Sequence, residues 1–188
     1  DLTSVFSAFE KKVDPFCKIE DDTYNTYKLA SANSRARLRM MTLYQIAQSH
    51  GGIVVGTGNK VEDFGVGFFT KYGDGGVDIS PIADCFKTEV WDMGREFGLP
   101  QEIIDAEPTD GLWADGRNDE DQIGMSYPEL ERMMAVNFLK SAGCLDLPGS
   151  AKLSKEDRAK LKRYQELRKR NMHKMEPIPV CKMPKSVL

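Results

Sequence analysis

The part of the sequence best equipped for chemistry runs from Gly51 to Lys87. A short apolar run at 53–55 opens into Gly56-Thr57-Gly58-Asn59-Lys60, and a second loop rich in Gly, Asp and Lys covers 70–78. In open α/β sheets, strands that end in such loops form ligand crevices, because the crevice lies beyond the carboxyl ends of the strands. We therefore expect the binding site in this stretch.

Lys87 stands at the start of a helical pattern over 87–97, which Gly98-Leu99-Pro100 ends. A lysine in the first turn opposes the helix dipole unless an anion lies nearby, and helix N-termini are good anion sites. A phosphate-binding lysine and a plain surface lysine therefore both fit. Neither generic phosphate motif is present, since 56–60 does not match G-x-x-x-x-G-K-[ST] and 73–76 does not match G-x-G-x-x-G.

Two further groups of charged residues are candidates. Arg35 and Arg39 share one face of an expected helix, and Arg37 shares another with Asn33. One pair can face a ligand while the other meets solvent, or all three arginines are surface residues. Residues 105–124 carry seven acids without the D-x-[DN]-x-[DN]-G order of a calcium loop. Because loops of this length are usually functional lids or disordered, we expect a loop that becomes ordered when ligand binds.

The composition describes one ordinary domain. A chain of 188 residues with 40% apolar residues can bury a single core, so we expect one domain over 1–188. The sequence has no long apolar run and no signal-peptide pattern at its start, so we expect no membrane insertion and a cytoplasmic location. The four cysteines lie far apart without a C-x-x-C pair, which argues against a zinc site.

Charge is distributed unevenly along the chain. Residues 150–188 contain 12 Lys/Arg and 4 Asp/Glu, whereas residues 1–149 contain 14 and 25. Such a basic tail can bind nucleic acid, a membrane surface or a polyphosphate, or it can be a solvated helix face. Nucleic-acid binding is disfavoured because no aromatic platform or reading helix accompanies the charges.

These candidates need a scaffold of helices around short strands. Apolar spacing predicts helices over 1–13, 31–49, 87–97, 126–141 and 154–170, with a loop over 14–27 and an extended tail over 177–184. Ser126 and Ser154 are helix-start signals, because each is followed by an acid three residues later. The helix, Gly51-Gly52 and the apolar run at 53–55 make half of an αβ unit. We predict an α/β fold with a partial doubly wound parallel sheet and a helix-rich C-terminal part.

Six polar motifs lie between residues 33 and 109. They are Asn33-x-Arg35-Ala36-Arg37-x-Arg39-Met40, Gly56-Thr57-Gly58-Asn59-Lys60-x-Glu62, Phe68-Phe69-Thr70-Lys71-Tyr72-Gly73-Asp74-Gly75-Gly76-x-Asp78, Pro81-Ile82, Lys87-Thr88 and Glu107-Pro108-Thr109. Together they closely resemble ammonia-dependent NAD synthetase, of the N-type ATP pyrophosphatase family. The resemblance is close over about residues 30–130 and looser over 1–12 and 154–178. It implies an α/β fold of the adenine-nucleotide alpha-hydrolase-like type.

The resemblance also implies a reaction, NAD biosynthesis by a ligase that forms a carbon–nitrogen bond. ATP adenylates the carboxylate of nicotinic acid adenine dinucleotide, pyrophosphate leaves, and ammonia then displaces AMP. Mg²⁺ as cofactor, ATP as a substrate and a homodimer are implied as well.

The family's site residues carry over by motif. Lys87 is the residue expected at the reacting phosphate, and Asp74 is a candidate for positioning ammonia. The expected ATP contacts are Thr57, Lys87 and Thr109, and the expected metal ligand is Glu62. The expected contacts to the deamido-dinucleotide are Arg37, Lys71, Asp78, His173 and Lys174. These types suit their roles, because polyphosphate needs compact cations and Mg²⁺ prefers carboxylate oxygen.

One family motif is missing. The Ser-Gly-Gly-x-Asp-Ser loop, which in the family cradles pyrophosphate and helps to bind Mg²⁺, has no counterpart in this chain. Because the chain starts at Asp1 rather than Met, we expect the C-terminal portion of a longer enzyme, incomplete at its N-terminus and poorly active or inactive alone. NAD formation by the isolated chain would refute this. The rival hypotheses are a fragment of a glutamine-dependent NAD synthetase and a catalytically inactive dinucleotide-binding or dimerisation module.

Overall fold

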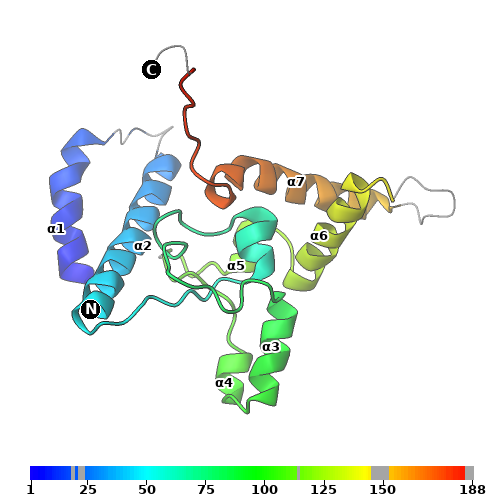
Figure 1. The fold of residues 1–188 in the computed structure, drawn as a ribbon, viewed down its shortest axis with the longest axis horizontal. Coiled ribbons are helices and arrows are strands. Elements are labelled where there is room, and N and C mark those ends of the chain that lie inside the picture. The colour runs from blue at the N-terminus through cyan, green and yellow to red at the C-terminus, as the bar shows by residue number, and fades with distance from the viewer. Residues whose placement is uncertain (18–19, 21–23, 114, 145–152, 185–188) are drawn as a thin grey trace.

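The computed structural model describes residues 1–17, 20, 24–113, 115–144 and 153–184. Figure 1 shows α1 and α2 lying side by side at one end, α6 and α7 at the other, and the polar loops between them. In chain order the described helices are α1 (Thr3–Val13), the 3-10 helix η1 (Asp14–Phe16), α2 (Tyr24–Ser49), the π-helix η2 (Val61–Val66), α3 (Lys87–Glu96), α4 (Gln101–Ile104), α5 (Asp119–Ile123), α6 (Tyr127–Ser141) and α7 (Lys155–Met175).

The five helices predicted from apolar spacing are all present, and two are longer than predicted. Helix α2 already begins at Tyr24, so the loop predicted over 14–27 is wrong at its end. The early turns of α2 are held against η1 and α1, because Tyr27 donates to Asp14 of η1 at 2.8 Å and Ser31 donates to Glu10 of α1 at 2.5 Å. Helix α7 continues past residue 170 to Met175, which places the predicted His-Lys pair in its last turn.

The predicted parallel sheet is reduced, among the described residues, to one isolated parallel bridge between Val55 and Ile79. Backbone hydrogen bonds flank it, from the Gly56 amide to the Ile79 carbonyl at 2.7 Å and from the Asp78 amide to the Val54 carbonyl at 2.9 Å. Paired strands without further neighbours are marginal in water, which explains why the run at 53–55 is extended but forms no longer strand. The helix-rich C-terminal part is confirmed.

The hydrophobic core joins η2 to α6 and α7. Its buried members are Val61, Val66, Ile123, Met125, Tyr127, Leu130, Met133, Leu161, Tyr164 and Leu167. The apolar residues of α7, Leu161, Tyr164 and Leu167, therefore pack on the body of the chain. Burying each large apolar side chain contributes about 1.5–3 kcal/mol, so this cluster fixes η2, which carries two acidic residues of the site described below.

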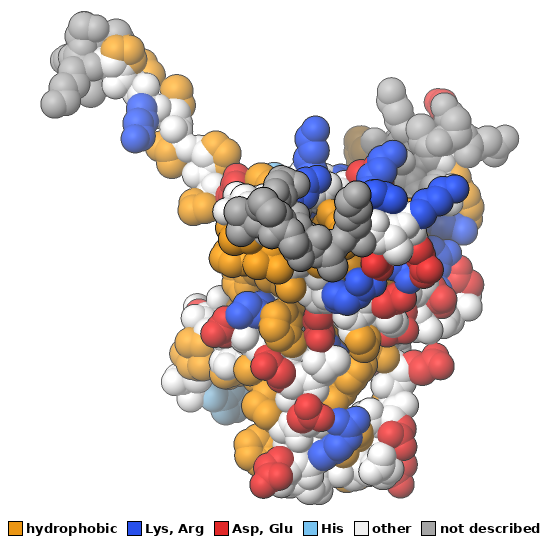
Figure 2. All heavy atoms as spheres, turned by 90° about the vertical axis from the view of Figure 1, so that its right-hand side faces the viewer, with side chains coloured by type: hydrophobic (Ala, Val, Ile, Leu, Met, Phe, Trp, Pro, Cys, Tyr) orange, Lys and Arg blue, Asp and Glu red, His pale blue; other side chains and the backbone are white. Residues whose placement is uncertain are grey.

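The helix starts predicted at Ser126 and Ser154 are confirmed. The Ser126 amide donates to the Glu129 carboxylate at 3.1 Å, and Ser154 Oγ accepts from the Asp157 amide at 3.0 Å. Charges of both signs intermix on the face seen in Figure 2. An ion pair from Lys160 to Glu129, at 2.6 Å, joins α7 to α6. Of the helices described, none has the length and apolar character needed to cross a membrane.

Candidate active site

A buried asparagine positions the acidic residues of η2. Asn59 is 2% exposed, and its Oδ1 accepts hydrogen bonds from the amides of Val61 at 3.2 Å and Glu62 at 3.1 Å. These bonds satisfy amides at the start of the helix that have no partner within it. Short π-helical segments are frequent at functional sites. Glu62 and Asp63 are thereby held in the first turn of η2.

Four side chains from separate elements meet beside this turn. Lys87 Nζ, at the start of α3, lies 3.4 Å from Glu62 Oε1 and 5.0 Å from the centre of the Tyr127 ring. The Tyr127 hydroxyl donates to Glu62 and lies 3.5 Å from Asp119 Oδ2. We call Glu62, Lys87, Asp119 and Tyr127 the acidic cluster. It brings together the predicted metal ligand and the predicted phosphate-binding lysine.

Burial and mutual repulsion shift the ionisation of the acidic cluster. Burial, followed by the charge of Glu62, raises the pKa of Asp119 to about 6, although Lys87 acts in the opposite direction. The same two causes raise the pKa of Tyr127, which keeps its hydroxyl protonated as a donor. The acidic cluster contains two carboxylates and one lysine, so a further positive charge would balance it. Within the described part of the chain, no group of three or more His, Cys, Asp or Glu side chains is arranged to hold a metal.

A cavity of about 170 Å³ lies between the 56–80 loops and the end of α7. It is lined by Gly56, Gly58, Asp63, Phe64, Phe69, Asp74, Gly75, Val77, Ser80, Lys174 and Met175. We call it the Asp63 pocket. The Lys174 ammonium closes one side by donating to the carbonyls of Gly67 at 2.9 Å and Phe69 at 2.7 Å. Burial lowers the pKa of Lys174, while the nearby Asp74 charge opposes that shift.

Asp74 is placed by its own loop. Its Oδ1 accepts a hydrogen bond from the Thr70 amide at 2.9 Å, and Thr70 Oγ1 donates to Asn33 Oδ1 on α2 at 2.7 Å. Desolvation by the surrounding protein raises the pKa of the Asp74 carboxyl, against the lowering effect of the Thr70 amide. The carboxylate predicted to position ammonia thus lines a pocket with a lysine and a second carboxylate.

Three residues predicted to contact the dinucleotide lie in one continuous row. Arg37 Nε donates to the Lys71 carbonyl at 3.2 Å, and Lys71 Nζ donates to the His173 carbonyl at 2.6 Å. These bonds join α2, the 70–78 loop and the last turn of α7, and Lys174 follows directly in the Asp63 pocket.

The other predicted contacts, Thr57, Asp78 and Thr109, line neither the acidic cluster nor the Asp63 pocket. Asp78 accepts from the Val54 amide at 2.8 Å and from the Tyr44 hydroxyl at 3.2 Å, so in this structure its carboxylate supports the parallel bridge. Thr57 is exposed, and Thr109 is exposed with its Oγ1 accepting from the Gly111 amide at 3.2 Å. Their nucleotide contacts stay predictions.

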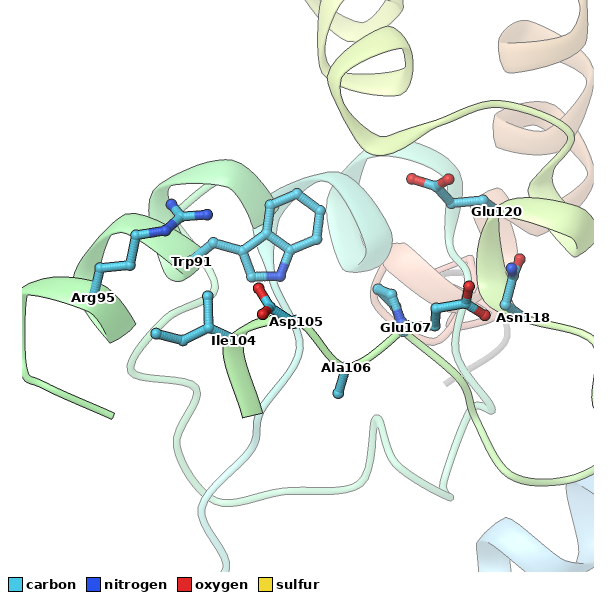
Figure 3. A pocket seen from close by; sticks show the side chains of 9 residues that line it. Trp91, Arg95, Ile104, Asp105, Ala106, Glu107, Asn118 and Glu120 are labelled. Carbon is cyan, nitrogen blue, oxygen red and sulfur yellow. The ribbon is translucent and has the colours of Figure 1, made fainter. Parts of the chain in front are cut away.

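A larger cavity, of about 270 Å³, is drawn in Figure 3. It lies between α3, α4 and α5, and Trp91 forms one wall while meeting the Tyr127 ring edge-on at 5.8 Å between ring centres. The acidic segment over 105–124 forms the other wall. The Asp119 amide donates to the Pro108 carbonyl at 2.9 Å, so part of the predicted loop is already ordered as α5.

A family model described as NAD synthase matches residues 1–178. The chain belongs to the NAD synthase family. It is similar to NH(3)-dependent NAD(+) synthetases of Mesoplasma florum, at 41% identity over 72% of the chain and 52% of that protein, and of Archaeoglobus fulgidus, at 39% identity over 83% of the chain and 57% of that protein. The chain thus spans about half the length of these curated relatives.

Solved structures of the family share the fold. The NMN synthetase of Francisella tularensis superposes with a TM-score of 0.71 at 31% identity, covering 97% of this chain and 63% of that one. The NH3-dependent NAD synthetase of Campylobacter jejuni, solved in complex with nitrate, gives a TM-score of 0.65 at 20% identity and covers 97% and 64% of the two chains. The latter likeness supports the fold alone.

Three members of these sites were not singled out from the sequence. Asp63 was hidden as the neighbour of Glu62, although two consecutive acids after a polar loop are a usable signal. Asp119 was one of seven acids in the 105–124 segment. Tyr127 stands at a helix start in the sequence, and only the tertiary contact with Glu62 reveals its hydroxyl as part of the acidic cluster.

Proposed function

We propose that the natural protein containing this chain amidates nicotinic acid adenine dinucleotide to NAD, with ATP and ammonia as co-substrates. The observation that carries the proposal is the family match over 1–178, together with the acidic cluster and the Asp63 pocket at the positions of the family's motifs. A homodimer and a cytoplasmic location are parts of the same proposal.

The reaction has two successive steps at one reacting carboxylate, and the two sites supply different residues to it. At the acidic cluster, Lys87 neutralises charge that develops on the α-phosphate as the substrate carboxylate attacks it and pyrophosphate departs. Ammonia then attacks the acyl carbonyl, the carbon–oxygen bond to AMP breaks, AMP leaves with that electron pair, and one proton is released. Asp74 and Lys174 line the pocket in which we place the second step.

A divalent cation, Mg²⁺ in our proposal, fits the acidic cluster. Mg²⁺ is usually bound through one or two carboxylates plus substrate phosphates, and Glu62 and Asp119 are two carboxylates that approach the same hydroxyl. Glu62 and Asp119 would hold the ion, which would supply charge stabilisation at the phosphates. The protein's own part is to fix both carboxylates through Tyr127 and to set Lys87 beside them.

Amidation of nicotinic acid mononucleotide is a second candidate. It is favoured by the similarity to the structure of an NMN synthetase, at 31% identity over 97% of this chain. Both reactions form the same amide from the same activated carboxylate. They differ in whether an adenosine monophosphate unit extends from the substrate phosphate.

The test is a product assay in which nicotinic acid adenine dinucleotide and nicotinic acid mononucleotide compete. The natural protein is incubated with ATP, Mg²⁺, ammonium and equal concentrations of both nucleotides, and the amides are separated by chromatography. We expect NAD to form faster than the mononucleotide amide, and glutamine to be a poor nitrogen donor. Faster mononucleotide amidation would favour the second candidate, and no amide from either would contradict both.

A further inference from the structure

Arg35 of α2 reaches across to the acidic segment. Its Nη1 donates to the Leu112 carbonyl at 3.2 Å, from a position 77 residues earlier in the chain. Its guanidinium carbon lies 5.1 Å from the centre of the ring of Phe6, a buried residue of α1. A planar guanidinium can stack on an aromatic ring and still donate through its edge. Arg35 thus joins α1, α2 and the acidic segment, whereas Arg37 and Arg39 of the same helix are exposed.

The turn that contains Leu112 is bound to α5 from its other side. The Leu112 amide donates to Asp110 Oδ1 at 2.9 Å, which closes the turn on itself. The Asp110 amide donates to Asp119 Oδ1 at 3.1 Å, and the Asp119 amide donates to the Pro108 carbonyl at 2.9 Å. This turn, residues 108–112, is therefore held between α5 on one side and α2 on the other.

The 108–112 turn carries Thr109, which was predicted to contact ATP. Thr109 is exposed, and it stands between the two residues whose backbone groups bind Asp119. The other carboxylate oxygen of Asp119 lies 3.5 Å from the Tyr127 hydroxyl in the acidic cluster. Surface segments that are held by a few hydrogen bonds open at a low free-energy cost. The position of Thr109 relative to the acidic cluster therefore depends on how firmly this turn is held.

The guanidinium of Arg35 carries more donors than this contact uses. Its Nε is buried and has no hydrogen-bond partner among the residues that the structure describes. An unpaired buried donor destabilises a folded chain, so stability alone does not account for an arginine at this position. Unfavourable local features of this kind are expected at functional sites, where other parts of the fold offset them.

We propose that Arg35 is a positioning residue for ATP, which acts by holding Thr109 toward the nucleotide through the Leu112 carbonyl. The inference rests on the proposed function for the identity of the nucleotide, but the tether itself stands on the contacts of Arg35. In the proposed reaction the triphosphate binds beside the acidic cluster, and the 108–112 turn is linked to that cluster through Asp119. Without Arg35 the turn keeps its bonds to α5 and loses its bond to α2.

The binding test uses the natural protein and an ATP analogue with a methylene group between its α- and β-phosphates, which cannot be cleaved there. Calorimetry gives its dissociation constant with Mg²⁺ present. Arg35→Ala should raise that constant about tenfold, the size expected when one hydrogen bond to a charged group is lost. Arg35→Lys keeps a donor and should recover part of the affinity. Arg39→Ala is the matched control, because Arg39 is an exposed arginine of the same helix. Unchanged affinity in Arg35→Ala would overturn the proposal.

A double variant tests whether Arg35 acts through Thr109. Thr109→Ala is combined with Arg35→Ala, and the dissociation constant of the same analogue is measured. The two losses of affinity should not add, because the tether has nothing left to position once the threonine hydroxyl is gone. Additive losses would show that Arg35 supports the fold in general, and they would overturn the positioning role.

Hydrogen exchange separates the tether from the proposed function. Without nucleotide, the backbone amides over 109–113 should exchange about tenfold faster in Arg35→Ala than in the unchanged protein, while those of α6 keep their rates. If neither NAD nor the mononucleotide amide forms in the competition assay, but the exchange rates and the analogue affinity both shift, the reaction is wrong and the tether is right. Equal exchange over 109–113 in the two proteins would overturn the tether.

Discussion

Lys87 Nζ lies 3.4 Å from Glu62 Oε1, and this ion pair joins the start of α3 to η2 across 25 positions of sequence. Both side chains are mostly shielded, at 21% and 14% exposed. A lysine at a helix start is stabilised by a nearby anion. Glu62 supplies that anion in the free protein, and we expect substrate phosphates to join it during the reaction.

Replacing Lys87 with Ala should lower the rate of adenylation about 100-fold to 1,000-fold, because a charge aimed at the reacting phosphate is lost. Dinucleotide affinity should change little. The rate is measured by exchange of labelled pyrophosphate into ATP, and affinity by calorimetry. Lys60→Ala is the control, since Lys60 pairs with exposed Asp84 at 2.8 Å. An unaltered exchange rate in Lys87→Ala would remove the lysine from the reaction.

Changing Glu62 to Gln should raise the Mg²⁺ concentration needed for half-maximal activity about tenfold, because a charged oxygen ligand becomes neutral. A metal titration at saturating ATP measures this. Glu166→Gln, an exposed change on α7, should leave the titration in place. If the Glu62 variant follows the same metal curve as the unchanged protein, Glu62 is no ligand.

Arg37→Ala should raise the KM for deamido-NAD about tenfold with little change in kcat, since the lost contact is present in the ground state and transition state alike. Arg39 offers a matched control, because it is an exposed arginine of the same helix outside the Arg37–Lys71–His173 row. Equal KM values for the two variants would count against the predicted dinucleotide contact.

Asp119→Asn should stabilise the protein at neutral pH. The folded state raises the pKa of Asp119 to about 6 from 3.8, so the stability linked to its proton is present below about pH 4 and is lost as pH rises through 6. A shift of this size corresponds to roughly 3 kcal/mol at most. Urea unfolding from pH 4 to 7 should show the advantage of the Asn variant growing with pH. Parallel curves for the two proteins would contradict the assignment.

The helices were well predicted from the sequence, because their start signals and apolar spacing are local. Ser126 and Ser154 cap where expected, whereas the early turns of α2 make contacts with α1 and η1 that spacing does not encode. The extent of the parallel sheet was overestimated, again because it depends on contacts between distant residues. Strand pairing is a long-range property, and within the described residues only Val55 and Ile79 form a bridge.

Site residues that belong to a family motif could be predicted from the sequence. Site residues whose role depends on tertiary contacts could not. Glu62, Lys87, Asp74 and Lys174 were each named from the family resemblance in separate roles. The structure brings Glu62 close to Lys87 and Asp74 close to Lys174. Asp63 enters its pocket through a close approach to Gly58, which no motif records. Asp78 shows the reverse case. It was expected to bind the dinucleotide, and in the structure its carboxylate accepts a hydrogen bond from the Val54 amide.

Amidation of a nicotinate nucleotide by way of an adenylated intermediate can be followed through the oxygen atoms of the substrate. The natural protein is incubated with ATP, ammonium and deamido-NAD labelled with ¹⁸O in the carboxylate. The molecular mass of the AMP that forms is then measured by mass spectrometry. We predict that NAD and AMP form in equal amounts and that one ¹⁸O atom appears in the AMP phosphate. NAD formation with unlabelled AMP, or with ADP as the product, would contradict the adenylated intermediate.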